Sequence, residues 1–322
     1  MIARRLGAAA LAVGLIGGAW LIRDRVIEDD ASADGPPREA HQIVCVSDLE
    51  TACAALDRER DDVSVRIEDA AVTLAATAGL EDASGAPVWV TMAPLPAMVD
   101  DLRDAARRAP LETTQSDIAS SPIALVVPVD RAAVLAKRCG APAIEWECLG
   151  DVAGEPWSDI DGAGLPGNVR PAFTPIDTAL GLLGVADAVA GYFGTAPIVV
   201  DDPDFVSWAR PLARAVSESA LSSGSAIATI QTRRSALDVA VGAEAELSDT
   251  SGSTFALAYA DPMIRADVVV AVPAGTSLPG DLVDDLAELL RAERWDPPSA
   301  DPNPLPGARD LLAIRAAWKE FT

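Results

Sequence analysis

The side chains that usually perform covalent catalysis are scarce in this sequence. Its 322 residues include one histidine, His41, which lies in a predicted linker. Serine and cysteine nucleophiles need a neighbouring base, so chemistry built on a histidine base is effectively excluded. The sequence also lacks the G-x-x-x-x-G-K-[ST] loop and the G-x-G-x-x-G motif that bind nucleotide phosphates.

Acidic residues are abundant and often adjacent, as at Asp100-Asp101, Asp201-Asp202 and Asp284-Asp285. Paired carboxylates hydrolyse glycosides, but a chain with 49 Asp and Glu against 25 Lys and Arg contains such pairs by composition alone. The net charge of −24 repels nucleic-acid phosphates and anionic lipids, and no basic cluster in the sequence offsets it. We therefore expect a protein without enzymatic activity, cofactor or nucleic-acid partner.

The cysteines form two pairs that are close in sequence: Cys45 with Cys53, and Cys139 with Cys148. Outside the cytoplasm an even number of cysteines favours disulfides, here within each pair, although four cysteines allow three pairings. A four-cysteine zinc site is the rival interpretation, but the sequence has no C-x2-C spacing, so we expect no metal. A buried free thiol at Cys45 is a further alternative.

An apolar stretch near the N-terminus has the character of a membrane anchor. Residues 6–22 are apolar or small, follow two arginines, and reach the short end of the roughly 17–25 residues that span a bilayer. Arg23 and Arg25 come next and no small-x-small cleavage site ends the run, so we predict an uncleaved signal anchor, a transmembrane helix, over residues 1–26. Residues 27–41 are the predicted linker. We expect the rest of this single-pass cell-membrane protein to be extracytoplasmic.

Strand-like runs alternate with helical ones from about residue 42 onward, which predicts a parallel sheet flanked by helices. The predicted strands are residues 43–46, 63–67, 88–90, 123–128, 169–173, 227–230, 237–241, 255–259 and 268–272. The predicted helices are residues 49–58, 70–78, 98–108, 178–193, 205–221, 280–294 and 307–321. The chain is long enough to form two coupled lobes.

A series of short motifs carries a family resemblance. Trp146-Glu147-Cys148-Leu149 is followed by Thr174-Pro175-Ile176-Asp177-Thr178-Ala179-Leu180-Gly181-Leu182. These stretches, with residues 44–56, 87–90, 121–128, 238–247 and 256–273, resemble the bacterial extracellular solute-binding proteins of the two-lobed type II periplasmic-binding-protein class. The resemblance is strongest to the molybdate-binding-like branch found in actinobacteria. It covers most of residues 42–322 and depends on the order and spacing of the motifs.

The resemblance implies an α/β fold of two lobes joined by two crossing strands, with a ligand gripped between them. Residues 42–120 and 256–322 are then lobe 1, and residues 121–255 are lobe 2. Strand ends and helix N-termini in such a fold present unpaired backbone N–H groups, which suit anions and small polar ligands. Lobe closure would bury the ligand.

The candidate ligand contacts follow from the same resemblance. They are Ser47, Thr91, Met92, Thr178 and Glu244, together with Asp177 beside Thr178 and Tyr259 on a presumed hinge strand. Other roles remain open, because Ser47, Asp177 and Thr178 also suit helix N-caps, Glu244 a solvated or capping carboxylate, and Tyr259 core packing.

The sequence departs from the family at two of these clusters. It has Met92-Ala93-Pro94 where the family commonly has Asp-Ser-Ser, and Gly242-Ala243 where the family has Thr-Thr. Each lost hydroxyl would weaken a buried oxyanion site by about 1 kcal/mol. Two hypotheses result. The protein binds a small ligand of unknown identity between its lobes, or it is a ligand-free scaffold or sensor of the cell envelope, with an envelope protein or a transporter as the candidate partner.

Overall fold

One mixed β-sheet organises the unit that runs from His41 to Thr322. The computed structural model describes residues 40–139, 144–217, 220–221, 224–247 and 254–322. Within them the strand order is β2-β1-β3-β8-β4-β6-β5, with β7 paired to β4. The strands are β1 (His41–Val46), β2 (Val63–Glu68), β3 (Val88–Met92), β4 (Thr113–Pro128), β5 (Pro171–Phe173), β6 (Val239–Ala243), β7 (Phe255–Ala258) and β8 (Arg265–Pro273).

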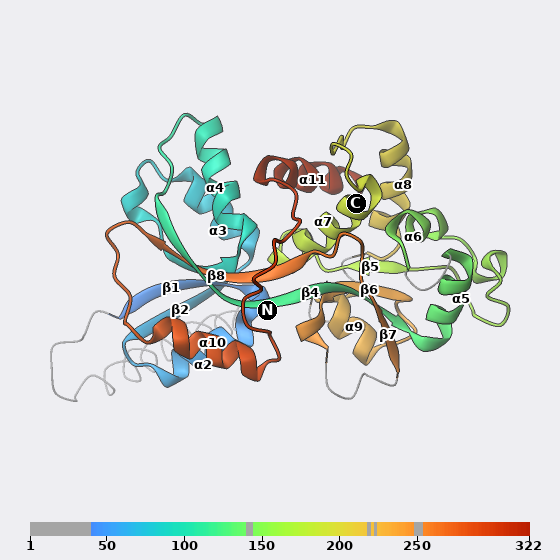
Figure 1. Ribbon diagram of the computed structural model, residues 1–322, viewed down its shortest axis with the longest axis horizontal. Coiled ribbons are helices and arrows are strands. Elements are labelled where there is room, and N and C mark those ends of the chain that lie inside the picture. The colour runs from blue at the N-terminus through green and yellow to red at the C-terminus, as the bar shows by residue number, and fades with distance from the viewer. Residues whose placement is uncertain (1–39, 140–143, 218–219, 222–223, 248–253) are drawn as a thin grey trace, which may run out of the picture. The chain divides into compact units, whose positions relative to one another are not determined.

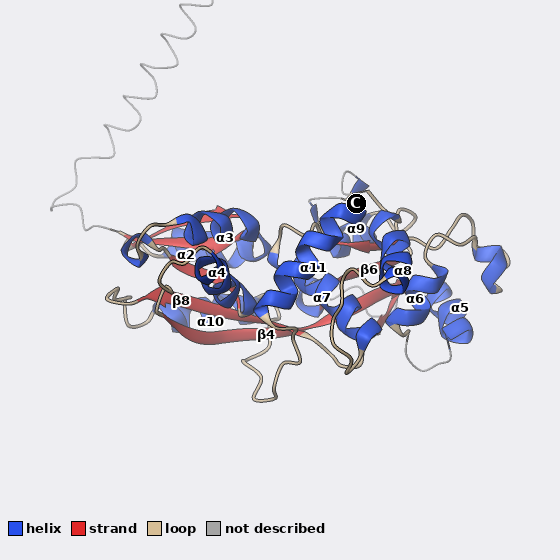
Figure 2. Cartoon of the chain, turned by 90° about the horizontal axis from the view of Figure 1, so that it is seen from above, coloured by secondary structure: helices blue, strands red, loops and turns tan. Residues whose placement is uncertain are grey.

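The sixteen-residue strand β4 belongs to both halves of the sheet. Its first part, from Thr113 to Pro122, pairs antiparallel with β8, and its second part, from Ile123 to Pro128, pairs antiparallel with β6 and β7. Figures 1 and 2 show β4 passing from one lobe into the other. The two halves of the sheet, each covered by helices, make a mixed α/β fold of two lobes, as the resemblance implied.

The first lobe is a three-layer sandwich. Strands β1, β2 and β3 are parallel, and β8 runs antiparallel beside β3. Helices α2 (Glu50–Glu59) and α10 (Leu282–Ala292) cover one face, and α3 (Ala70–Gly79) and α4 (Pro94–Ala105) cover the other (Figure 1). The pattern of α10 shows why it packs there: Leu282, Leu286 and Leu290 lie four residues apart on one buried side of the helix.

The second lobe places β5, β6 and β7 beside the end of β4, with α7 and α9 on opposite faces of β6 (Figure 1). Its helices are α5 (Val129–Cys139), α6 (Trp146–Val152), α7 (Ala179–Phe193), α8 (Pro203–Arg214) and α9 (Ala226–Thr232). Helix α7 is buried on nearly every side, which explains why its apolar residues follow no single face. The last helix, α11 (Ala308–Phe321), packs against α4 of the first lobe and against α7 and α8 of the second.

Both predicted disulfides are confirmed. Cys45–Cys53 joins β1 to α2, with its Cα atoms 6.5 Å apart, and Cys139–Cys148 joins the end of α5 to α6, with its Cα atoms 5.7 Å apart. Each bond therefore fastens a helix to a neighbouring element of the same lobe.

Three secondary-structure predictions were wrong. The helix predicted over residues 205–221 ends at Arg214. Residues 227–230 belong to α9, which begins after Ser225, whose hydroxyl accepts a hydrogen bond from the Ala228 N–H at 3.2 Å. A short apolar run fits a buried helix as well as a strand, so its pattern could not separate them. The sheet is mixed and not parallel, because β4 and β8 run against their neighbours.

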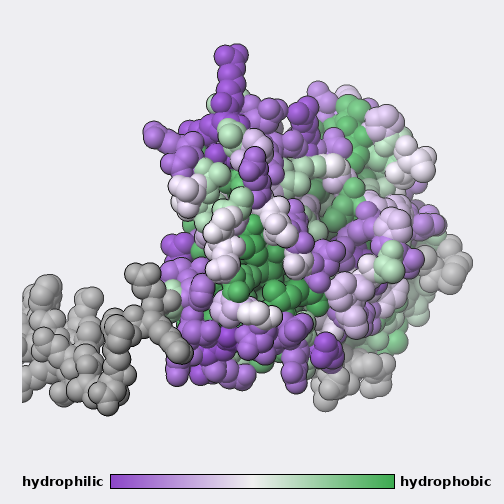
Figure 3. All heavy atoms as spheres, turned by 60° about the vertical axis from the view of Figure 1, so that its left-hand side comes forward, coloured by the Kyte–Doolittle hydropathy of each residue, from purple (hydrophilic) through white to green (hydrophobic). Residues whose placement is uncertain are grey.

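The predicted membrane anchor and most of the predicted linker lie outside the described residues. His41, which was placed in the linker, is the first residue of β1 and pairs with Val63 of β2. Among the residues that are described, none of the helices combines the length and the apolar character needed to span a bilayer. Hydrophilic side chains cover most of the face drawn in Figure 3, with apolar side chains visible near its centre.

Candidate functional site

The two lobes touch where β1 ends and α7 begins. After β1, residues 47–49 form one 3-10 turn, and the carboxylate of Asp48 in that turn accepts hydrogen bonds from the backbone N–H groups of Ala179 at 2.8 Å and Leu180 at 3.2 Å. We call this pair of hydrogen bonds the interlobe contact. The first amides of a helix have no partner within the helix and carry its positive dipole end, so they favour an anion. Here the anion is the protein's own carboxylate.

The start of α7 is also fastened from within the second lobe. The hydroxyl of Thr178 accepts a hydrogen bond from the Gly181 N–H at 3.0 Å, so Thr178 is the N-cap of the helix. A Cβ atom on Gly181 would lie 1.9 Å from the carbonyl oxygen of Pro175, which explains the glycine at this position. Thr178 and Asp48 together therefore satisfy three amides of the first turn.

A second carboxylate, that of Glu246, lies close to Asp48. It accepts hydrogen bonds from the Ser225 hydroxyl at 2.9 Å and from the Ala243 N–H at 3.0 Å. Burial raises the pKa of Glu246 to about 7, and the negative charge of Asp48 adds to this effect. Burial also raises the pKa of Asp48, although the Ala179 and Leu180 amides oppose it. Asp48 and Glu246 are thus two neighbouring acids that protonate more readily than an exposed carboxylate.

Two of the residues predicted to contact a ligand, Ser47 and Asp177, instead bind side chains on or next to other helices. The Ser47 hydroxyl donates to Asp69, at the start of α3, at 2.7 Å. Asp177 forms ion pairs with Arg315 at 2.5 Å and Lys319 at 2.6 Å, both on α11. Burial opposes it, yet these two cations lower the pKa of Asp177, so its carboxylate is committed to holding α11.

Thr91 and Met92, at the end of β3, are fully buried. The Thr91 hydroxyl has no hydrogen-bond partner among the described residues, and Met92 is one of the largest fully buried side chains. The end of β3 therefore contributes a buried apolar side chain, that of Met92.

Glu244 and Tyr259 lie together beside β4, the strand that belongs to both lobes. The Tyr259 hydroxyl donates to Glu244 at 2.8 Å, and burial, followed by the contact with Glu244, raises the pKa of Tyr259 to about 12. Glu244 also lines a cavity of about 120 Å³ next to Ser121 and Arg294. A cavity of that volume holds a few water molecules or a small ion, not a sugar-sized ligand.

The sequence predictions missed Asp48 and Glu246, the two carboxylates at the centre of this region. The only signal for Asp48 was its place next to Ser47 in the turn after the first strand. Its partner amides lie 131 and 132 residues further along the chain. No pattern local to either segment pairs them.

No protein-family model matches the sequence, and the search of curated proteins finds no match either. Solved structures do match. The periplasmic binding protein AfuA from Actinobacillus pleuropneumoniae, with fructose-6-phosphate bound, has a TM-score of 0.54 at 12% identity over 87% of this chain and 98% of that chain. Iron-bound HitA from Pseudomonas aeruginosa has a TM-score of 0.52 at 12% identity over 87% and 99%.

A third similar structure is the apo ferric ion-binding protein A from Pasteurella haemolytica, with a TM-score of 0.50 at 12% identity over 87% of this chain and 96% of that chain. All three span nearly their whole length in the comparison, and this includes both lobes. The fold of this chain is therefore the two-lobed fold of the periplasmic binding proteins.

Proposed function

We propose that this chain is an extracytoplasmic binding protein in which Asp48 holds the lobes together, and that a small anionic ligand binds by replacing the Asp48 carboxylate. The observation that carries the proposal is the pair of hydrogen bonds that Asp48 accepts from Ala179 and Leu180. A phosphate, a molybdate-like oxyanion or a ligand carboxylate would meet the same two amides.

The energetics of the interlobe contact make the ligand a competitor of Asp48. A hydrogen bond to a charged group contributes roughly 1.5–3 kcal/mol, so the two amides reward any anion that reaches them. Asp48 is attached to the same chain and is always close, whereas a free ligand must be present at sufficient concentration. Anion binding is then weak while Asp48 is in place and stronger once it is removed.

The ligands of the similar structures give this proposal partial support. Fructose-6-phosphate, held by the A. pleuropneumoniae protein, carries the kind of anion that a helix N-terminus suits. The iron of the P. aeruginosa protein is a weaker guide. Among the described residues no three His, Cys, Asp or Glu side chains are grouped so that they could hold a metal.

The proposed location has two supports. The apolar run of residues 6–22, flanked by arginines, has the length and charge pattern of a signal anchor. The two disulfides suit an oxidising compartment outside the cytoplasm. Labelling intact cells with a reagent that cannot cross the membrane tests this location, and a globular domain that becomes reactive only after lysis would contradict it.

The proposed function is tested with Asp48→Ala and, as a matched control, Glu59→Ala, which removes an exposed acid at the end of α2. Thermal melting is followed with phosphate, molybdate and fructose-6-phosphate. We expect at least one anion to bind Asp48→Ala about tenfold more tightly than the wild type, with Glu59→Ala unchanged. An Asp48→Ala protein that folds and responds to none of the anions would overturn the proposal.

A second function is favoured by the packing at the end of β3. The Met92 side chain is fully buried there, and the Glu244 carboxylate already accepts a hydrogen bond from the Tyr259 hydroxyl. With these groups unavailable to a ligand, the same fold would serve as a ligand-free scaffold or sensor in the cell envelope. Cross-linking in native membranes tests it. Recovery of the same envelope protein with wild type and Asp48→Ala would support this alternative, and the absence of any cross-linked partner would count against it.

A further inference from the structure

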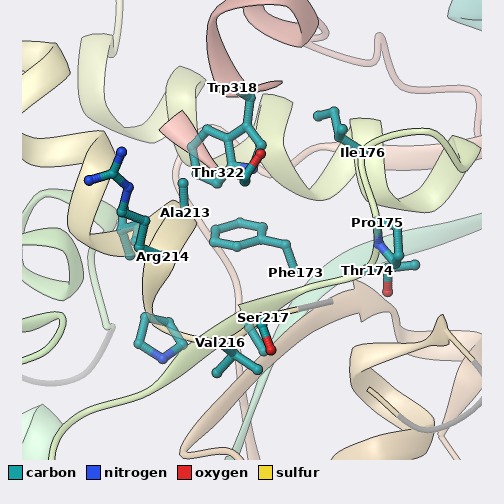
Figure 4. Close-up of a pocket in the computed structure, with 13 residues that line it drawn as sticks. Phe173, Thr174, Pro175, Ile176, Ala213, Arg214, Val216, Ser217, Trp318 and Thr322 are labelled. Carbon is teal, nitrogen blue, oxygen red and sulfur yellow. The ribbon is translucent and has the colours of Figure 1, made fainter. Parts of the chain in front are cut away.

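A cavity in the second lobe lies apart from the interlobe contact. It has a volume of about 390 Å³ and is bounded by β5, the end of α8 and the end of α11. Its apolar lining includes Phe173, Leu212, Val216 and Trp318. Figure 4 shows Phe173 in the middle of the cavity, between Trp318 and Val216. The volume falls within the usual range for sites that hold small organic molecules.

The aromatic floor of this cavity is rigidly supported. The Phe173 ring stacks on Trp146, with centroids 5.6 Å apart, and meets Trp318 edge to face at 5.0 Å. Trp146 is in turn fixed by a buried hydrogen bond from its indole Nε1 to Asp187 at 2.8 Å. A rigid apolar surface of this kind binds a ligand without a large ordering cost.

Arginine side chains stand at the edge of the cavity. Arg214 lines it and also lines an adjacent cavity of about 690 Å³, together with Arg170. The Arg214 Nε donates to the carbonyl oxygen of Phe321 at 2.6 Å, and within the described residues no carboxylate is paired with this side chain. Arg210, one turn earlier on α8, lies over the Phe321 ring at 5.9 Å from its centroid.

In having no described carboxylate partner, Arg214 differs from Arg170, which forms an ion pair with the Asp238 carboxylate at 3.2 Å. Elsewhere in the described chain, Arg60, Arg131 and Arg315 each bind a carboxylate. A third cavity, on the other side of Pro211, is lined by acids that include Glu147, Asp151 and Asp204. The side of α8 that carries Arg214 is therefore the side on which the local charge favours an anion.

We propose that this arginine cavity, defined by Phe173, Val216, Trp318 and Arg214, binds a small carboxylic acid with an apolar or aromatic body. The body would lie against Phe173 and Trp318, and the carboxylate would pair with the terminal nitrogens of Arg214. Guanidinium and carboxylate match in geometry and charge, and burial of the apolar body supplies the remaining free energy. Asp48, Ala179 and Leu180 are not among the residues that line this cavity.

The probe is 3-phenylpropionate, with its neutral amide 3-phenylpropionamide as the matched ligand control. We expect calorimetry to give a dissociation constant on the order of 1 mM or tighter for the acid, and binding at least about tenfold weaker for the amide. Saturation of the full chain with about 10 mM acid and no detectable binding would overturn the proposal.

Two variants locate the bound acid. Arg214→Gln removes the charge and should weaken the acid about tenfold while leaving the amide unchanged. Val216→Trp fills the cavity and should abolish binding of both the acid and the amide. This variant keeps Arg214, so it tests the site even if Arg214→Gln weakens the packing of α11. The control is Arg309→Gln, an arginine that is 79% exposed and lies on the other end of α11.

The remaining outcomes separate this site from the proposed function. Asp48→Ala should bind 3-phenylpropionate as the wild type does, because Asp48 is not part of the cavity. Binding that survives both Arg214→Gln and Val216→Trp, or that changes about tenfold in Asp48→Ala, would assign the acid to another place and overturn the proposal.

Discussion

The protein offers positive charge to an anion at two places, and it treats them differently. At the N-terminus of α7 the backbone amides are occupied by Asp48 of the other lobe. Beside β5, Arg214 lines an aromatic cavity, and no described carboxylate pairs with its side chain. The first place is satisfied from within and joins the lobes, whereas the second is open to a ligand. A shared fold therefore does not locate the binding site by itself. The positively charged group that can bind a ligand is the one that no carboxylate of the chain already occupies.

One residue supports both places, and its loss should have the largest effect. Trp146 stacks under Phe173 of the arginine cavity and hydrogen-bonds Asp187 on α7, the helix that receives Asp48. Trp146→Ala should lower the free energy of unfolding by about 3–5 kcal/mol, because it leaves a large cavity and removes the indole N–H whose hydrogen bond the buried Asp187 accepts. Urea denaturation measures this loss. Trp146→Phe, which keeps a ring but loses the indole N–H, should cost about 1–3 kcal/mol. Equal costs for both variants would show that the ring has no structural role.

Removing the interlobe contact separates the two places. Asp48→Ala should lower the free energy of unfolding by about 1–3 kcal/mol, since two helix N-terminal amides lose a charged acceptor. The exposed control Glu59→Ala should change it by less than about 0.5 kcal/mol. Chemical denaturation of both variants makes the comparison. If Asp48→Ala is as stable as its control, the contact does not hold the lobes.

The pH dependence of stability tests the region around Asp48, where burial raises the pKa values of two neighbouring acids, Asp48 and Glu246. Burial also raises the pKa of Asp187, the acid that binds Trp146, to about 7. The pKa of Glu246 is about 7, above the value of about 4.5 that it has when unfolded, so between these values the folded chain binds a proton that the unfolded chain has released. The resulting stabilisation is complete below about pH 4.5 and is lost as the pH rises through about 7. Asp48, whose pKa burial also raises, acts in the same direction.

Glu246→Gln should remove the part of this pH dependence that Glu246 contributes, while the parts from Asp48 and Asp187 remain. Relative to the variant, the wild type should lose roughly 1–2 kcal/mol of unfolding free energy between about pH 5 and pH 7.5, after allowance for solvent screening of a partly exposed group. Asp62→Asn is the control of opposite sign. The hydrogen bond from Arg60 lowers the pKa of Asp62, so its contribution is lost on acidification. Parallel pH profiles for wild type and Glu246→Gln would contradict the assignment.

The fold was largely predictable from the sequence, since local patterns determine local elements. The runs that became β1, β3 and β8 are apolar enough to mark buried strands, and the alternation of β2 marks a half-buried one. The amphipathic spacing of α10 and α11 is clear. The first part of β4 was missed because its residues from Thr113 to Asp117 are mostly polar and only partly buried, so periodicity gave no strand signal. Its strand character comes from pairing with β8.

The binding region was less predictable, because its chemistry is made by contacts between distant segments. Thr178 was expected as a helix cap or a ligand contact, and the cap is what the structure shows. Asp177 was expected in the same region, but its partners lie on α11, and the first of them, Arg315, is 138 residues further along. Arg214 carried no signal at all, since a single arginine in a helix is unremarkable until β5 and α11 place a cavity beside it.

The smallest expected effect concerns the stability of the open site. If the arginine cavity is built to receive a ligand, Arg214 should contribute little to folding, since its described protein contact is one hydrogen bond from Nε to the Phe321 carbonyl. Arg214→Gln should therefore change the free energy of unfolding by no more than about 1 kcal/mol without a ligand. Denaturation with and without 3-phenylpropionate measures this, and the acid should stabilise the wild type more than the variant. A much larger loss in the absence of the acid would make Arg214 a structural clamp on α11, equivalent in role to Asp48, and the difference between the two places would disappear.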